Sequence, residues 1–195
     1  MLTIIDAPDK IGEKKACAAV ALMFFAGLRP GEARGVWWED FDGKRLIVRQ
    51  SVWHTHTTTP KTASSLKPVP VIEPLRSVLL ALRQADGNPD SGLILRGPSG
   101  KPLDLHNVAN RVVIPTLKRA GIPWHGWYSL RRGVATTVTS LSKDPHAAKG
   151  LLRHSNVSTT ERHYIKDVPE NTLDAMKQLE SLCNECGKTS ESKPN

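Results

Sequence analysis

The chain contains Tyr128-Ser-Leu-Arg131, then Leu152-Arg153-His154-Ser155, then Ser158-Thr-Thr-Glu161-Arg162-His163-Tyr164. Arg131, His154 and Tyr164 thus lie within 34 residues, and the segments between them are long enough to form helices. A helical fold of this segment would bring the three side chains onto one phosphodiester. Positive charge around the phosphate and a tyrosine nucleophile are what metal-free attack on phosphorus requires. The pattern therefore predicts a mainly helical fold with phosphate chemistry.

A further arginine, Arg29, lies far upstream in Ala26-Gly-Leu-Arg29-Pro-Gly-Glu32. Apolar residues recur at helical spacing from Ile11 to Phe25, and Gly27 suits the C-terminal cap of that buried helix. A proline in the first turn predicts a short second helix from Pro30 to Val36. Arg29 is then placed beside a helix N-terminus, where anions bind readily.

The remaining segments predict one α+β domain that is mainly α. Residues 45–53 and 67–71 are rich in β-formers and predict a small antiparallel sheet. Helical periodicity and capping signals predict helices over residues 73–85, 105–120, 130–141, 145–152, 159–165 and 169–182. We expect the catalytic domain to cover residues 1–186, and the polar residues 187–195 to form a disordered tail.

Composition favours a polyanionic partner. The formal net charge is +8 and the isoelectric point is about 9.6, a balance shared by many nucleic-acid-binding proteins. No apolar run is long enough for a membrane span, and residues 1–6 do not resemble a signal peptide, so we expect a soluble cytoplasmic protein without a membrane partner. Three cysteines are too few for a disulfide framework, and Cys183-Asn-Glu-Cys186 supplies two of the four ligands of a structural zinc.

Two arginines are the candidate phosphate clamps. Arginine matches phosphate oxygens with two parallel donors, which lysine cannot do, so Arg29 and Arg131 are the expected pair. Other readings stay open at this point. Arg29 could cap a helix or pair with Glu32, and a histidine after a helix, such as His154, is often only a C-terminal cap.

Five segments, in order, resemble those of the tyrosine recombinase, or phage-type integrase, family. They are Ala26-Gly-Leu-Arg29-Pro-Gly-Glu32, Pro60-Lys61-Thr-Ala-Ser-Ser65, Tyr128-Ser-Leu-Arg131, Leu151-Leu-Arg-His154-Ser and Thr159-Thr-Glu-Arg-His-Tyr164. The resemblance spans residues 11 to 182. Any single segment would be a weak signal, but five in the family order are a strong one.

The resemblance implies a reaction and a role for each residue. Tyr164 would attack the scissile phosphate of double-stranded DNA and form a covalent 3′-phosphotyrosyl link. Arg29, Arg131 and His154 would stabilise the transition state, and Lys61 would protonate the leaving oxygen, with Lys67 as its nearest rival. No cofactor or metal is implied. Family members act as tetramers on DNA, and we expect a monomer without DNA and a role in mobile-element integration or excision.

The chain departs from the family pattern at two positions. Tyr128 stands where the family has histidine or lysine. Histidine exchanges protons near neutral pH, whereas a protonated tyrosine serves mainly as a hydrogen-bond donor. We therefore expect Tyr128 to orient a phosphate oxygen. Arg153 stands where the family has glycine, and both Arg153 and Arg132 are expected to contact the DNA backbone.

The family usually carries a separate helical DNA-grasping domain before the catalytic one, and we expect this chain to lack it. The helix over residues 169–182 has an apolar stripe that suits packing on its own domain or, by resemblance, docking on a neighbouring protomer. Two other functions compete with recombination. One is DNA relaxation of the type IB topoisomerase kind, and the other is DNA binding without catalysis.

Overall fold

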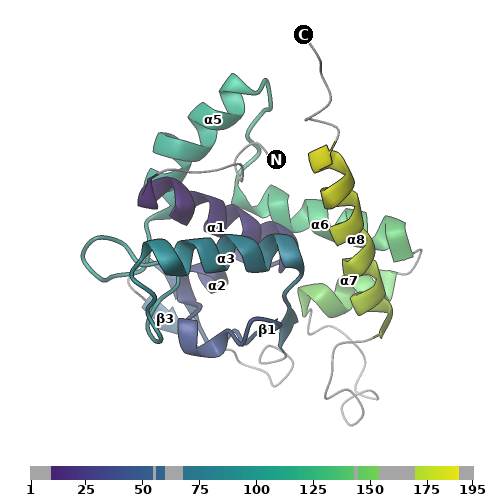
Figure 1. The fold of residues 1–195 in the computed structure, drawn as a ribbon, viewed down its shortest axis with the longest axis horizontal. Helices are drawn as coiled ribbons and strands as arrows, with labels where there is room; N and C mark the ends of the chain where they lie inside the picture. The colour runs from purple at the N-terminus through teal and green to yellow at the C-terminus, as the bar shows by residue number, and fades with distance from the viewer. Residues whose placement is uncertain (1–9, 55, 60–67, 143–144, 154–169, 189–195) are drawn as a thin grey trace.

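The computed structural model describes residues 10–54, 56–59, 68–142, 145–153 and 170–188. Helices dominate the described part of the chain and two small antiparallel sheets complete it, which confirms the predicted mainly α fold (Figure 1). The helices are α1 Ile11–Phe25, α2 Pro30–Gly35, α3 Glu73–Ala85, α4 Leu105–Val108, α5 Ile114–Arg119, α6 Trp127–Ser142, α7 Pro145–Leu152 and α8 Glu170–Lys188. No described helix combines the length and the apolarity that a membrane crossing requires.

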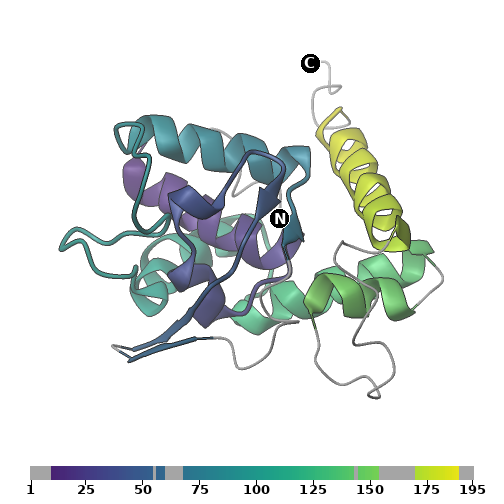
Figure 2. The same ribbon diagram turned by 90° about the horizontal axis from the view of Figure 1, so that it is seen from below.

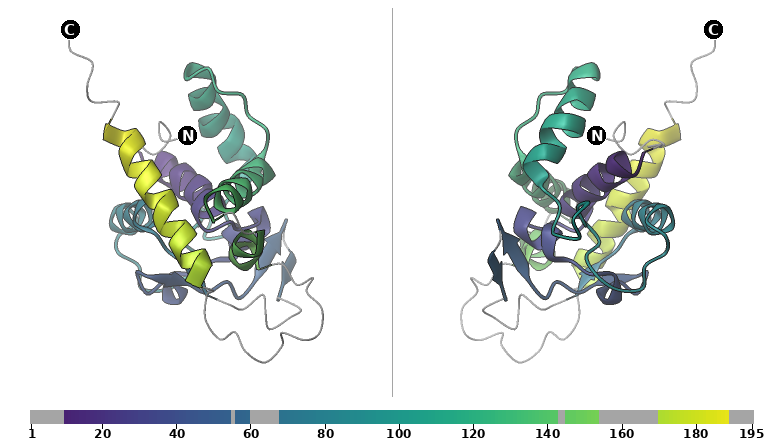
Figure 3. Two further views of the ribbon diagram at one scale, coloured as in Figure 1. Left: turned by 90° about the vertical axis from the view of Figure 1, so that its right-hand side faces the viewer. Right: turned by 90° about the vertical axis from the view of Figure 1, so that its left-hand side faces the viewer.

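Helix α1 is the centre of the core. It packs against α3 on one side and against α6 and α2 on others (Figures 1 and 3). Its residues from Ala16 to Met23 are all buried, so the helix is apolar around its whole circumference, as expected of a helix enclosed by others. The alanines keep its surface narrow enough for several neighbours to approach closely. The two ends of α1 match the predicted helix.

The predicted antiparallel sheet between residues 45–53 and 67–71 is present, but only Arg45 and Leu46 of the first segment belong to it. β1, Arg45–Leu46, pairs antiparallel with β4, Val69–Pro70, whereas β2, Ser51–Trp53, pairs antiparallel with β3, His56–Thr58. The segment 45–53, predicted as one strand, therefore contributes to two separate sheets. Propensity does not specify a strand's partner, and β3 lies in a Thr-rich stretch that was not predicted to be a strand. The β2–β3 hairpin projects from the body of the molecule (Figure 2).

Three predicted helices, 11–25, 73–85 and 145–152, have the predicted ends, and four others are present with shifted ends. Residues 105–119 are helical, but a π-helical segment, η4 from Ala109 to Val113, separates α4 from α5. Pro115 lacks the N–H that a continuous α-helix would use there, which accounts for an irregular turn just before it. Helix α6 begins at Trp127, three residues before the predicted start. The predicted helix 159–165 lies outside the described residues.

Helix α8 packs on its own domain. Its buried face consists of Thr172, Ala175, Met176 and Leu179, which lie against α6 and α7 (Figure 3). Of the predicted stripe, Met176 and Leu179 are buried, while Leu173 and Leu182 are exposed. The helix continues to Lys188 and so includes the first two residues of the predicted tail.

Candidate phosphate-binding site

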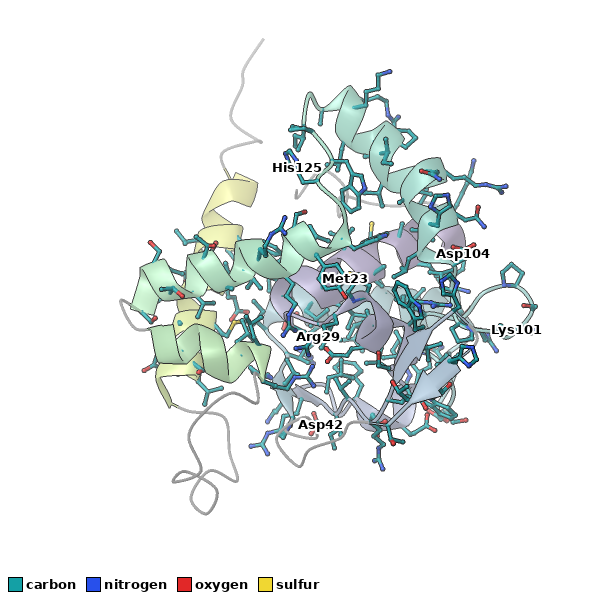
Figure 4. All side chains as sticks on the ribbon, turned by 180° about the vertical axis from the view of Figure 1, so that it is seen from behind. Met23, Arg29, Asp42, Lys101, Asp104 and His125 are labelled. Carbon is teal, nitrogen blue, oxygen red and sulfur yellow. The ribbon has the colours of Figure 1, made fainter. Side chains whose placement is uncertain are left out.

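Arg29 is placed by the junction between α1 and α2. Gly27 has a φ of 59°, a left-handed conformation that reverses the chain after α1. Arg29 then precedes Pro30, whose missing N–H is tolerated in the first turn of a helix. The Arg29 backbone N–H donates to Glu32 Oε2 at 2.9 Å, and Arg29 Nη1 pairs with Glu32 Oε1 at 2.9 Å. The side chain remains 43% exposed, so it is available to a ligand (Figure 4).

Arg131 is buried and links three helices by hydrogen bonds. It projects from α6, its Nη1 donates to the carbonyl of Gly27 at the end of α1, and its Nη2 donates to the carbonyl of Leu152 at the end of α7 at 2.7 Å. Nη1 also lies 3.9 Å from Glu32 Oε2. The fork of one guanidinium thus fixes the end of α7 beside Arg29.

Arg153 is the third arginine of the cluster. Its backbone φ is 52°, the left-handed region that favours glycine. Its side chain is 3% exposed, and Nη2 pairs with Glu32 Oε2 at 2.8 Å. We expected the Arg153 side chain to face the DNA backbone. In the structure its guanidinium instead points inward and pairs with Glu32, after a left-handed turn of the backbone. The DNA contact itself stays a prediction.

Glu32 joins all three arginines, although Arg131 and Arg153 both lie more than 100 residues beyond Arg29 in the sequence. Burial raises the pKa of Glu32, but the charge of Arg153, the backbone N–H of Arg29 and the charges of Arg29 and Arg131 outweigh it, so the pKa lies below its ordinary value. The carboxylate is therefore ionised at neutral pH.

The cluster carries a net positive charge. Burial, together with the charge of Arg29, lowers the pKa of Arg131 to about 10, and burial also lowers the pKa of Arg153. A pKa of about 10 still leaves Arg131 protonated at pH 7. Three guanidinium charges against one carboxylate leave +2, and the exposed member, Arg29, presents this charge to solvent. Such an arrangement suits an anion such as a phosphate.

Some of the predicted site residues lie close together in the structure, and others lie outside the described residues. Tyr128 lies on α6 one turn before Arg131 and is 53% exposed. Arg132 is exposed on the same helix, so it is open to a ligand. Lys61, His154 and Tyr164 lie outside the described residues. Within the described ranges, no group of three or more His, Cys, Asp or Glu side chains forms a metal site.

The central position of Glu32 was not predicted. The sequence analysis offered Glu32 only as a partner for Arg29, three residues away. In the structure Glu32 also accepts a hydrogen bond from Arg153, which lies 121 residues away in the sequence. The available signal was its place as the third residue of a helix, from which a glutamate accepts the N–H of the residue before the helix.

The sequence resembles known proteins over most of its length. Residues 1–171 match the model of the phage integrase family. A tyrosine recombinase XerC-like protein of Caldanaerobacter subterraneus subsp. tengcongensis is 26% identical, with 85% of this chain and 49% of the relative covered. Tyrosine recombinase XerC of Methylobacterium sp. is 31% identical, with 80% and 47% covered. The chain spans about half the length of these curated relatives.

Two solved structures share the fold. One is the Tn1549 transposon integrase in complex with transposon right end DNA, with a TM-score of 0.61 and 19% identity over 83% of this chain and 58% of that one. The other is the same integrase in complex with circular intermediate DNA, with a TM-score of 0.59 and 18% identity. The family match over most of the sequence, the shared fold and the arginine cluster agree, and the chain belongs to the phage integrase family.

Proposed function

We propose that this chain is the catalytic part of a site-specific DNA recombinase that cuts and rejoins DNA through a covalent 3′-phosphotyrosyl link. The observation that carries the proposal is the convergence of Arg29 and Arg131 on Glu32, with a net charge of +2 and an exposed Arg29. The relatives named as tyrosine recombinases and the DNA-bound integrases of similar fold support it.

In the proposed reaction the Tyr164 hydroxyl gives its proton to water and its oxygen attacks the scissile phosphorus. A P–O bond to tyrosine forms as the P–O5′ bond breaks, and Lys61 gives its proton to the leaving 5′ oxygen. Arg29, Arg131 and His154 stabilise the charge that builds on the non-bridging oxygens. Attack by the 5′-hydroxyl of another strand reverses these steps and releases the tyrosine. Bond energy is kept in the covalent intermediate, so the cycle calls for no cofactor.

We propose separate tasks for the three arginines, and their pairing around Glu32 supports this division. Arg153 pairs with Glu32, and Arg131 acts on the phosphate through its charge, because both of its terminal nitrogens already donate to carbonyls. Arg29 is exposed enough to bind a phosphate oxygen directly. Tyr128, exposed at the start of α6, donates a hydrogen bond to the phosphate, and Arg132 contacts the neighbouring backbone. We assign the chain a double-stranded DNA partner, a tetramer on DNA and a role in moving a mobile element.

A nicked DNA duplex that traps the cleaved state tests this proposal. The duplex comes from the attachment region of the element, and a short strand beyond the scissile phosphate diffuses away after cleavage. We expect a covalent protein–DNA band on a denaturing gel with the native chain and none with Tyr164→Phe. DNA that is bound but never linked would favour DNA binding without catalysis. Relaxation of supercoils without recombinant product would favour the topoisomerase reaction.

A further inference from the structure

Arg34, on helix α2, makes three hydrogen bonds to backbone carbonyls. Its Nε donates to Leu103 at 2.9 Å, its Nη1 to Val52 at 3.1 Å and its Nη2 to His54 at 3.2 Å. Val52 lies in β2 and His54 in the turn that follows it, so two of the bonds hold the β2–β3 hairpin. The third holds the loop before α4. One planar guanidinium thus joins α2 to two other segments.

Two glycines on α2 bring the helix and the hairpin strand into backbone contact. A Cβ added at Gly31 would lie 2.5 Å from Ser51 Oγ and 3.2 Å from the Val52 carbonyl oxygen. A Cβ at Gly35 would lie 2.8 Å from the Gln50 carbonyl oxygen. Any larger side chain would separate the two elements. The glycines therefore set the spacing between α2 and residues 50–52.

The exposed arginine of the phosphate site is joined directly to helix α2. Arg29 is the residue immediately before α2, and Arg34 lies in its last turn. A displacement of the hairpin relative to α2 is therefore a displacement relative to Arg29. The hairpin ends at Thr58, and Lys61, outside the described residues, follows three positions later in the sequence.

His54 adds a reason for the hairpin turn to need support. Its φ is 52°, a left-handed conformation that an L side chain adopts at a cost. The ring of Trp53 packs edge-on against the His54 ring, with the centroids 5.0 Å apart, although Trp53 is largely exposed. The hydrogen bond from Arg34 to the His54 carbonyl ties this strained turn to helix α2.

We propose that Arg34 is a positioning residue for the cleavage reaction: it fixes the β2–β3 hairpin relative to Arg29, and so sets how efficiently the leaving 5′ oxygen is protonated. The inference rests on the proposed function, in which the proton donor follows the hairpin in sequence. A displacement of about 1 Å in an active site can cost about 10²-fold in rate. Lysine cannot replace Arg34, because one ammonium does not span three carbonyls in a plane.

The test compares two leaving atoms in single-turnover cleavage. In one nicked duplex the 5′ leaving atom is oxygen, which must take a proton as the P–O bond breaks. In the other it is sulfur, which departs as a thiolate and takes no proton in that step. We expect Arg34→Lys and Arg34→Ala to cut the oxygen substrate about 10- to 100-fold more slowly than the native chain, and to cut the sulfur substrate within about threefold of it.

Two further variants calibrate this result. Lys61→Ala should show the same pattern, and Arg34→Ala combined with Lys61→Ala should be no slower on the oxygen substrate than Lys61→Ala alone. Arg83→Ala is the matched control, because Arg83 also holds a loop by donating to a backbone carbonyl, that of Pro89 at 2.9 Å, but outside the phosphate site. We expect Arg83→Ala to cleave both substrates like the native chain.

Each other outcome has a definite meaning. Equal losses on both substrates for Arg34→Lys, with the melting curve of a folded protein, would overturn the inference, because Arg34 would then act on DNA binding or on phosphorus attack. Arg34→Lys at the native rate on the oxygen substrate would overturn it as well. A native chain that links to neither substrate would overturn the proposed function, and the inference with it.

Discussion

Two regions of the molecule contain ion pairs between similar residues and differ in their surroundings. Around Glu32, Arg131 and Arg153 are almost fully buried and the carboxylate has three cationic neighbours. On helix α8, Lys177 and Asp174 pair at 3.3 Å, with side chains 74% and 59% exposed. Water and salt screen the second pair, whereas the first is left uncompensated if one partner is removed. Burial, more than the distance between the charges, decides how much each ion pair contributes to the stability of the fold.

Glu32→Gln has the largest expected effect on stability. The amide has no charge to balance Arg131 and Arg153, which remain buried. Removing one partner of a buried ion pair costs about 3–5 kcal/mol in free energy of unfolding. Urea unfolding of the purified variant measures this. A loss no larger than that of a surface substitution would show that the cluster is not a buried ionic centre.

The same carboxylate predicts a pH dependence. The pKa of Glu32 is lower in the folded chain than its ordinary value of 4.5, so its contribution to stability is fully present above about that pH. The contribution is lost as the pH falls further, through the folded-state pKa. We therefore expect the stability gap between the native chain and Glu32→Gln to narrow below about pH 4.5. A gap that stays constant from pH 7 to pH 3 would disprove the assigned direction.

Arg131→Lys should have the next largest effect. A lysine ammonium cannot donate to the Gly27 and Leu152 carbonyls in the same fork, so at least one buried acceptor loses its partner. An unsatisfied buried acceptor costs about 1–3 kcal/mol. Urea unfolding gives the value, and Arg132→Lys on the exposed side of α6 is the control. Equal stability of the two variants would mean that the hydrogen bonds from Arg131 to the Gly27 and Leu152 carbonyls do not form.

Arg153→Gly and Arg153→Ala separate the charge from the backbone. Both remove a partner of Glu32, but only glycine relieves the left-handed conformation at φ 52°. We expect the alanine variant to be less stable than the glycine variant by about 1 kcal/mol. Thermal unfolding of the pair decides this. If alanine is the more stable of the two, the backbone at this position is not left-handed.

Lys177→Ala should have the smallest effect. The Lys177–Asp174 pair is exposed, and exposed pairs contribute at most about 1 kcal/mol before screening by salt. We expect a change of at most about 0.5 kcal/mol, disappearing at high ionic strength. Urea unfolding at low and high salt tests both parts. A cost comparable to that of Glu32→Gln would remove the distinction between the two regions.

The sequence predicted the helices and strands better than it predicted which strands pair and which side chains contact one another. The ends of α1 and α3 follow from periodicity and caps that lie within each segment. The division of residues 45–53 between two sheets did not, because strand pairing is set by tertiary contacts. Arg29 and Arg131 were predicted as a pair from their sequence contexts, and both lie beside Glu32, while their role at a phosphate stays a prediction. Arg153 was expected at the DNA, and its inward turn depends on a backbone angle that no local pattern revealed.

Arg34 shows a different limit of sequence analysis. Its three acceptors are backbone carbonyls, which leave no trace in residue types. The only local signal was a pair of glycines, Gly31 and Gly35, four residues apart on a short helix. Such spacing indicates that another backbone approaches the helix closely. It does not indicate which one.

The central claim is that Arg29 acts on the negative charge of the scissile phosphate. The most direct test is single-turnover cleavage by the native chain and by Arg29→Ala, on a nicked duplex with either an ordinary scissile phosphate or an uncharged methylphosphonate. We predict that Arg29→Ala is slower than the native chain by about 10²- to 10³-fold on the phosphate, and that the difference largely disappears on the methylphosphonate. The same difference on both substrates would contradict the claim, because Arg29 would then serve only to hold Glu32 and the start of α2.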